Sequence, residues 1–287
     1  MICAHNESET INASKRGFGI MNKINWPMKV HAVKLEYRRL KLQNMRHGYF
    51  RDINGKRTLV ITYDPDDPKT SSRRPRRLLT GSSFGKRFAE EIKEYLEIKN
   101  EYDGLLADWN ARYSFEPPRV RFPIVQFADP HVMNNNYFNI QEDRLGKYTP
   151  DIPTVSKFGD LKSKNELIGA ELLEQMGIPF KYETQVYLKG INETINPDYL
   201  INFYEIDRCA YLEILGMNDQ IDYFYRSAKK IYGFSKETYR PGREVIYIFL
   251  YDKQNFDEAY FVGEVLSAFE SMIPDDALIW KDDSEAV

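Results

Sequence analysis

The stretch NPDYLINFYEIDRCAYLEILG, residues 196–216, decides the fold because it holds two strongly apolar runs with a carboxylate in each. Asp198 directly follows a proline at the start of the first run, and Glu213 stands in the middle of the second. If the runs are neighbouring strands of a sheet covered on both faces, both acids emerge at one edge of it. Two carboxylates and a backbone carbonyl are ligands that Mg²⁺ prefers, so the pattern predicts a site for a divalent cation.

Each acid also has a purely structural interpretation. An aspartate after proline is typical of a turn, so Asp198 can simply end a loop. An unpaired buried carboxylate is costly, but Glu213 on an edge strand can pair with a cation such as Arg208. The sequence leaves both alternatives open.

The surrounding segments predict a mixed α/β fold. Residues 162–176 have a helical pattern, with Ser163 as N-cap, Glu166 at the capping-box position and Gly177 as the stop. Extended runs rich in Tyr, Ile, Leu and Val follow. The expected order is αβββαβα, with strands in 179–188, 193–204, 209–216 and 243–252, and further helices in 218–234 and 256–273.

The N-terminal half predicts an α+β module with a long helix. We expect a flexible arm over 1–28, a basic helix over 29–45, a hairpin around Asn54-Gly55, an irregular loop over 64–83 and an amphipathic helix over 84–113. Residues rich in Pro, Gly and Asn form a connector, which places a domain boundary near residue 150. The predicted division is a flexible arm, a basic module, a connector and a C-terminal domain, at 1–28, 29–115, 116–155 and 156–280.

Basic residues are concentrated in the N-terminal half. The chain has 287 residues and a net charge of −3, yet residues 28–87 hold 16 Lys or Arg against 5 Asp or Glu. This segregation predicts a module that grips the phosphate backbone of DNA. The candidate contacts are Arg73, Arg74, Arg76, Arg77, Lys56 and Arg57. A solvated surface or an acidic protein partner is the alternative.

Composition excludes several other classes of protein. The two cysteines, Cys3 and Cys209, lie far apart without a CxxC pattern or clustered histidines, so neither a disulfide framework nor a zinc site is expected. No apolar run approaches the roughly 20 residues of a membrane span, and residues 1–18 lack the apolar centre of a signal peptide. We therefore expect a cytoplasmic protein without membrane contact.

An ordered set of motifs in the C-terminal half carries a family resemblance. The motifs are Ser163-Lys164-Asn165-Glu166 on a helix, Gly177-Ile178-Pro179-Phe180-Lys181-Tyr182-Glu183, Pro197-Asp198-Tyr199-Leu200-Ile201, and Tyr211-Leu212-Glu213-Ile214-Leu215-Gly216-Met217. In this order, residues 162 to about 272 resemble the PD-(D/E)XK nuclease superfamily. The most similar pattern is that of nuclease domains found alone or attached to helicases in bacteria and phages.

The resemblance implies a restriction-endonuclease-like αβββαβ core and a Mg²⁺ (or Mn²⁺) cofactor. It makes Asp198, Glu213 and the main-chain carbonyl of Ile214 metal ligands, with Glu166 acting through water. Where the superfamily has its lysine, this chain has Leu215. In the related domains the lysine lies on the following helix.

That helix offers two lysines, Lys229 and Lys230, of which Lys230 is preferred for a place beside the attacking water or the phosphate. Both lysines can instead belong to a solvated helix face. Glu166 can likewise be a capping residue alone.

Two functional hypotheses follow. The first is a metal-dependent endonuclease or exonuclease that hydrolyses DNA phosphodiester bonds in bacterial or phage DNA processing or defence. The second is a catalytically silent nucleic-acid-binding or inhibitory protein that retains the nuclease fold. The apolar stripe of the 84–113 helix also needs a partner surface, either the C-terminal domain or a second copy in a homodimer.

Overall fold

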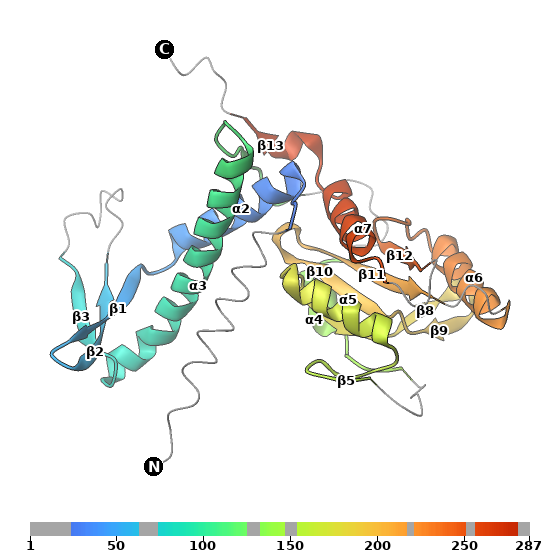
Figure 1. Ribbon diagram of the computed structural model, residues 1–287, viewed down its shortest axis with the longest axis horizontal. Coiled ribbons are helices and arrows are strands. Elements are labelled where there is room, and N and C mark those ends of the chain that lie inside the picture. Colours follow the sequence, from blue (N-terminus) through green and yellow to red (C-terminus); the bar gives the residue numbers. More distant parts are fainter. Residues whose placement is uncertain are drawn as a thin grey trace. The chain divides into compact units, whose positions relative to one another are not determined.

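The protein is a mixed α/β chain that forms two compact units (Figure 1). The computed structural model describes residues 24–62, 74–124, 133–146, 154–216, 221–250 and 256–280. One unit contains residues 31–119, and the other contains residues 24–30 together with those from 120 onward. This division falls inside the predicted connector, 116–155. Across the described ranges, no helix combines the length and apolar character needed to cross a bilayer.

The first unit combines two helices with a small antiparallel sheet. Its elements are α2 (Met28–Asn44, which begins in the other unit), β1 (Gly48–Ile53), β2 (Lys56–Ile61), β3 (Arg76–Leu79) and α3 (Ser83–Arg112). Asn54 and Gly55 have φ angles of 51° and 72°, as a type I′ turn requires. The predicted basic helix, hairpin and long helix are thus confirmed.

Strand β3 corrects the prediction of an irregular loop over 64–83. Residues 76–79 pair antiparallel with β2, with Thr58 opposite Leu79. The outer edge of β2 offers unpaired backbone groups, and Leu78 packs against the buried cluster of Leu59, Ile61 and Ile92. These tertiary contacts override the local preference of a segment rich in proline and arginine. Residues 64–73 of the predicted loop lie outside the described residues.

Most of the apolar stripe of α3 is covered within its own unit, although Phe84 at its start is 54% exposed. Ile92 packs with β2 residues in the small core, and Trp109 meets the ring of His31 on α2 at a centroid distance of 5.2 Å. His31 also bonds to the main-chain carbonyl of Leu105, with 2.8 Å between Nε2 and the oxygen. The partner surface is therefore α2 and the β1–β2–β3 sheet. A homodimer through α3 remains a prediction, but the apolar stripe no longer requires it.

The second unit is built on a four-stranded mixed sheet. Its order is β12-β11-β10-β7, with β7, β10 and β11 antiparallel and β12 parallel to β11. Because β10 and β11 are inner strands covered on both faces, their sequences are mostly apolar, with Asn202 in β10 and Glu213 in β11 as buried polar exceptions. The sheet strands and main helices are α5 (Lys164–Gln175), β7 (Phe180–Tyr182), β10 (Tyr199–Phe203), β11 (Arg208–Leu215), α6 (Ile221–Lys236), β12 (Val245–Phe249) and α7 (Glu258–Ser271).

Smaller elements decorate this unit. They are β4 (Arg119–Val120), which begins in the first unit, α4 (Asn135–Ile140), β5 (Thr154–Ser156), β6 (Gly159–Leu161), β8 (Val186–Leu188), β9 (Glu193–Ile195), β13 (Leu278–Ile279) and three single-turn 3₁₀ helices, Lys189–Ile191, Tyr204–Ile206 and Asp275–Ala277. Helix α4, inside the predicted connector, places Phe138 in the core.

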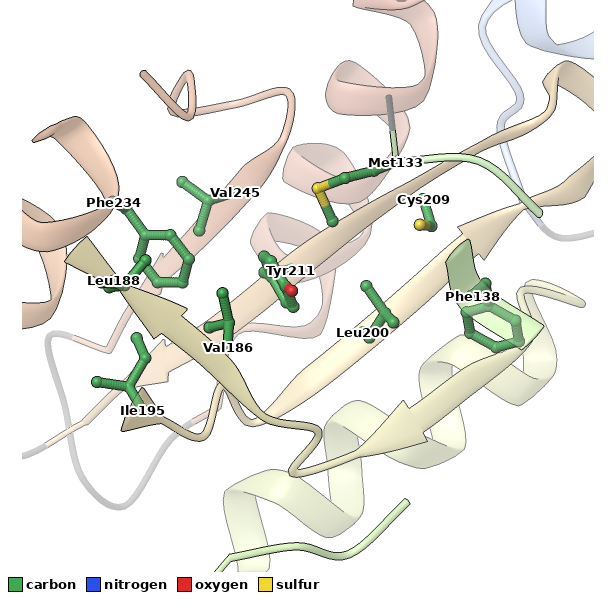
Figure 2. Packing of buried hydrophobic residues seen from close by; sticks show 10 residues of the cluster. All are labelled: Met133, Phe138, Val186, Leu188, Ile195, Leu200, Cys209, Tyr211, Phe234 and Val245. Atoms are coloured by element: carbon green, nitrogen blue, oxygen red, sulfur yellow. The ribbon is translucent and has the colours of Figure 1, made fainter. Parts of the chain in front are cut away.

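Helices cover both faces of the main sheet. On one face Phe269 of α7 stacks on Phe203 at a ring centroid distance of 4.6 Å, and Gly169 of α5 lets Ile214 approach closely. On the other face lies the main hydrophobic cluster, which contains Phe234 of α6, in ring contact with Tyr211, together with residues of β8, β9 and α4 (Figure 2). Strand β11 therefore presents Tyr211 and Glu213 toward α6, and Ile214 toward α5.

Two of the predicted extended runs are each divided. Glu183 has a φ angle of 48°, so run 179–188 breaks into β7 and β8. Run 193–204 breaks into β9 and β10, with Pro197 between them. Strands β8 and β9 form a separate hairpin. With that hairpin inserted, the order α5, β7, β10, β11, α6, β12, α7 follows the predicted αβββαβα.

Candidate functional site

The two acids of residues 196–216 lie side by side at the junction of β10 and β11. The register places Tyr199 opposite Leu212, so Asp198, one residue earlier, stands next to Glu213. The Oδ2 atom of Asp198 accepts a hydrogen bond from the main-chain N–H of Ile214 at 2.6 Å. Asp198 is thus held by the neighbouring strand and is more than a turn residue.

Glu213 is almost completely buried, and Lys230 is its partner. The side chain of Glu213 is 2% exposed. The Lys230 ammonium donates to both carboxylate oxygens, at 2.9 and 2.8 Å, and to the main-chain carbonyl of Asn196 at 3.4 Å. Since β11 is an inner strand and Arg208 donates to the main-chain carbonyl of Asp207, the pairing of Glu213 with Arg208 on an edge strand is wrong.

The adjacent lysine points elsewhere. Lys229 is half exposed and pairs with Glu193 at 2.5 Å. Consecutive helical residues point about 100° apart, so only one of the two can face the sheet. The inward face of α6 carries Ser227 and Phe234, which are buried, and Lys230 lies on that side. Of the two candidate lysines, the structure brings Lys230 to the acids.

Glu166 both caps α5 and belongs to the acidic cluster. Ser163 is the N-cap and accepts from the main-chain N–H of Glu166. The Glu166 carboxylate accepts from the N–H of Lys162 at 2.9 Å, the hydroxyl of Tyr182 at 2.6 Å and the hydroxyl of Ser163 at 3.1 Å. The charge of Asp198 also acts on it. Capping and a place at the site are therefore compatible.

The three acids of this cluster all have raised pKa values, and burial is the largest cause for each. Burial raises the pKa of Glu213 to about 7 although Lys230 lowers it, and Asp198 and Glu166 raise it further. Burial, followed by the charge of Asp198, raises the pKa of Glu166 to about 7. Burial also raises the pKa of Asp198, against Lys230 and the Ile214 N–H. Lys230, together with Lys162 at Asp198, does not offset the burial and mutual repulsion of the three acids, so the environment favours an additional cation.

Lys230 itself stays charged. Burial lowers its pKa, but Glu213 and then Asp198 outweigh that effect, and the net pKa is raised. The site therefore holds a charged ammonium beside Glu213 and Glu166, whose pKa values are both about 7.

Three neighbours of the acids were not identified from the sequence as site residues. Tyr182 donates to Glu166, and Lys162 pairs with Glu183 while its charge also lowers the pKa of Asp198. The hydroxyl of Tyr223 donates to the main-chain carbonyl of Ile214 at 3.4 Å. Tyr182 lies in the motif of residues 177–183, but the chain has 20 tyrosines, and nothing in the local sequence distinguishes Tyr182 and Tyr223 from packing residues.

The atoms at the site that could ligate a metal are oxygens, which suits Mg²⁺ or Mn²⁺. Within the ranges that the structure describes, no three or more His, Cys, Asp or Glu side chains are grouped so as to hold a metal ion. The predicted inner ligands include only two such side chains, Asp198 and Glu213, with the main-chain carbonyl of Ile214 as the third. These oxygen ligands, two of them carboxylates with raised pKa values, fit a divalent cation.

The predicted DNA-contacting residues lie on the small sheet of the first unit. Lys56 and Arg57 begin β2, Arg76 and Arg77 begin β3, and Arg74 precedes it; all five are exposed. The guanidinium groups of Arg57 and Arg76 lie over the rings of Phe50 and Phe84. Arg73 lies outside the described residues.

Comparison with known proteins identifies no relative: no protein-family model, curated protein or solved structure matches this chain. The site is therefore characterised by its own geometry. It consists of Asp198 and Glu213 at neighbouring inner strands, Lys230 bonded to Glu213, and Glu166, whose charge raises the pKa of Glu213. Carboxylate and carbonyl oxygens in this arrangement are suited to binding a cation.

Proposed function

We propose that the protein is a metal-dependent nuclease that hydrolyses DNA phosphodiester bonds. The observation that carries the proposal is the contact of Lys230 with buried Glu213 next to Asp198, because a silent fold has no need for a costly buried acid and lysine together. The order and pairing of α5, β7, β10, β11, α6 and β12 support it, since they agree with the restriction-endonuclease-like core that the resemblance implies.

In this proposal Asp198, Glu213 and the Ile214 carbonyl hold Mg²⁺ or Mn²⁺, and Glu166 assists through water. The bound cation lowers the pKa of water and neutralises charge on the scissile phosphate. Lys230, held near the acids and permanently charged, stabilises negative charge that develops on the phosphate. Tyr223 orients the Ile214 carbonyl through its hydroxyl group.

The basic sheet of the first unit supplies DNA affinity. Lys56, Arg57, Arg74, Arg76 and Arg77 are exposed, and none makes an ion pair with another described residue. Exposed cations spaced along extended strands suit successive phosphates. In the bacterial or phage setting that the resemblance suggests, this module would hold DNA while the acidic site cuts it.

The test is cleavage of linear, circular and single-stranded DNA with Mg²⁺ by wild type, Asp198→Asn and Glu213→Gln. Each variant is expected to lose at least about 10²-fold in rate, whereas Asp160→Asn, which removes an exposed acid on β6, serves as the control and keeps the activity. A second readout is thermal unfolding. Millimolar Mg²⁺ should raise the melting temperature of wild type and not that of Asp198→Asn. An active Asp198→Asn enzyme contradicts the proposal.

The second candidate is a silent nucleic-acid-binding or inhibitory protein, and one observation favours it. Lys230 donates to both oxygens of Glu213, so the ion pair is satisfied without a metal. If this function is correct, the protein binds DNA without Mg²⁺, and the Asp198→Asn variant binds DNA with the same affinity as wild type. Absence of both cleavage and a Mg²⁺ effect on melting would select it.

A further inference from the structure

Helix α6 presents an aromatic face whose side chains are each more than half exposed. Ile221, Phe224, Tyr225 and Tyr232 are 69%, 53%, 65% and 53% exposed. Their spacing of three, four and seven residues places them on one side of the helix. The opposite side of the helix packs against the rest of the unit, since Phe234 lies in the core and Lys230 contacts Glu213. The same helix thus carries a site lysine and an exposed aromatic surface, which we call the α6 aromatic face.

A pocket of about 410 Å³ opens beside this face. Its lining includes Phe224, Ile231 and Tyr232 of α6, and Leu215 and Phe249 at the ends of β11 and β12. Side chains alternate along a strand, so Leu215 lies on the same side of β11 as Glu213. The pocket therefore begins two residues along β11 from Glu213, on the same side of the strand. Its volume lies in the range of small-molecule sites, about 300–1,000 Å³.

The charges around the aromatic face identify its occupant. Apart from Lys230, which faces Glu213, helix α6 carries the exposed cations Arg226, Lys229 and Lys236 against a single acid, Asp222, a net charge of +2 in a chain of −3. Lys236 extends over the ring of Tyr232, with its ammonium 5.3 Å from the ring centroid. A second copy of α6 would bring these like charges together, which disfavours a symmetric pair. A ligand with flat apolar groups and regularly spaced negative charges meets both requirements.

Resting on the proposed nuclease function, we infer that the α6 aromatic face and its pocket bind unpaired bases of the DNA strand that enters the site. Bases stack on aromatic rings while cations between the rings take up the phosphates. In a duplex the bases are stacked on one another, so their faces are not available to Phe224 or Tyr232. The preferred substrate is therefore DNA with a single-stranded segment.

Binding without cleavage tests the inference. Fluorescence anisotropy in EDTA compares a labelled single-stranded oligonucleotide with a duplex of equal length. Phe224→Leu and Tyr232→Leu keep apolar bulk and remove the ring, while Phe224→Tyr keeps a ring. We expect each Leu variant to weaken single-strand binding about 5- to 150-fold and duplex binding less than about 2-fold. Trp280→Ala, which removes a half-exposed ring elsewhere in this unit, is the control and leaves both unchanged.

The outcomes separate this inference from the proposed function. If the Leu variants bind single strands as wild type does while Mg²⁺-dependent cleavage persists, the stacking inference is overturned and the nuclease stands. If single-strand affinity falls as expected but wild type never cleaves, the base-binding face stands and the nuclease does not. Equal loss in Phe224→Tyr and Phe224→Leu, or a change in sedimentation from dimer to monomer with unaltered DNA binding, also overturns the inference.

Discussion

The two units of the chain handle charge in opposite ways. In the second unit Glu213 is 2% exposed, and its partner Lys230 is held by hydrogen bonds to both carboxylate oxygens. In the first unit Arg76 and Arg77 lie on an exposed strand, without an ion pair to another described residue. A buried charge must have a partner because desolvation is costly. Exposed charges carry no such constraint, so their role depends on a ligand and on salt.

The largest expected effect comes from removing Lys230. Lys230→Met leaves Glu213 buried without a partner, which is expected to destabilise the protein by about 3–5 kcal/mol and to lower the cleavage rate by about 10²- to 10³-fold. Lys229→Met, the matched change one residue away, removes only a surface pair with Glu193, and less than about 1 kcal/mol is expected.

Urea unfolding and DNA cleavage measure the two effects of these lysine changes. Equal behaviour of Lys229→Met and Lys230→Met would remove the distinction between the buried and exposed lysines, and with it the assignment of Lys230 to the site.

The second prediction concerns the exposed arginines of the first unit. Replacing Arg74, Arg76 and Arg77 together by Gln should leave stability unchanged within about 0.5 kcal/mol but reduce the slope of log affinity against log salt by up to about 3. Sequence preference should not change. Lys157→Gln, an exposed lysine on the second unit, is the control. An unaltered slope with intact folding would assign the basic sheet to a protein partner.

The same contrast explains which features were predictable from the sequence. Helices α3, α5 and α7 have strong periodicity, and the Asn54-Gly55 turn has its own conformational signature, so local physics was sufficient. Strand β3 and the β8–β9 hairpin depend on partners distant in sequence or on the left-handed conformation of Glu183. Periodicity contains no information about either.

At the site, the strand-borne acids were predictable because acids inside apolar runs are conspicuous. The orientation of α6 was less accessible, since its exposed side is as aromatic as its buried side. Only the packing of Phe234 in the core shows that Lys230 faces Glu213 and Lys229 does not. The contributions of Tyr182 and Lys162 arise from side-chain contacts between separate elements, which no linear motif specifies.

The third prediction is a pH dependence that belongs to the buried acid. Glu213 has its pKa raised to about 7, so between its unfolded value of about 4.5 and 7 the folded state binds more protons than the unfolded state. Stability from this group is present below about pH 4.5 and is lost as the pH rises through 7. We expect Glu213→Gln to recover about 1–3 kcal/mol at pH 7.5 relative to pH 5, compared with wild type.

Urea unfolding of wild type and Glu213→Gln at both pH values measures the contribution of this carboxylate together with its effect on Asp198 and Glu166. Millimolar Mg²⁺ should reduce the pH dependence of wild type, because a cation favours the ionised carboxylates. A difference between the two proteins that does not vary with pH would show that Glu213 is already ionised at pH 5.

The smallest effect is expected from a hydroxyl group in each environment. Tyr182 donates to the Glu166 carboxylate and Tyr187 donates to the Asn192 side chain, both at 2.6 Å, but the first bond is buried and the second is exposed. Tyr182→Phe should cost about 1 kcal/mol and raise the pKa of Glu166 further, because the ionised form loses a donor. Tyr187→Phe should cost almost nothing, since water replaces the lost partner. Chemical denaturation at about pH 8, where Glu166 is mainly ionised, gives the larger difference, and denaturation at about pH 5 gives the smaller one. Equal costs for the two tyrosines at both pH values would mean that burial does not set the strength of contacts at this site, and would break the comparison on which the other predictions rest.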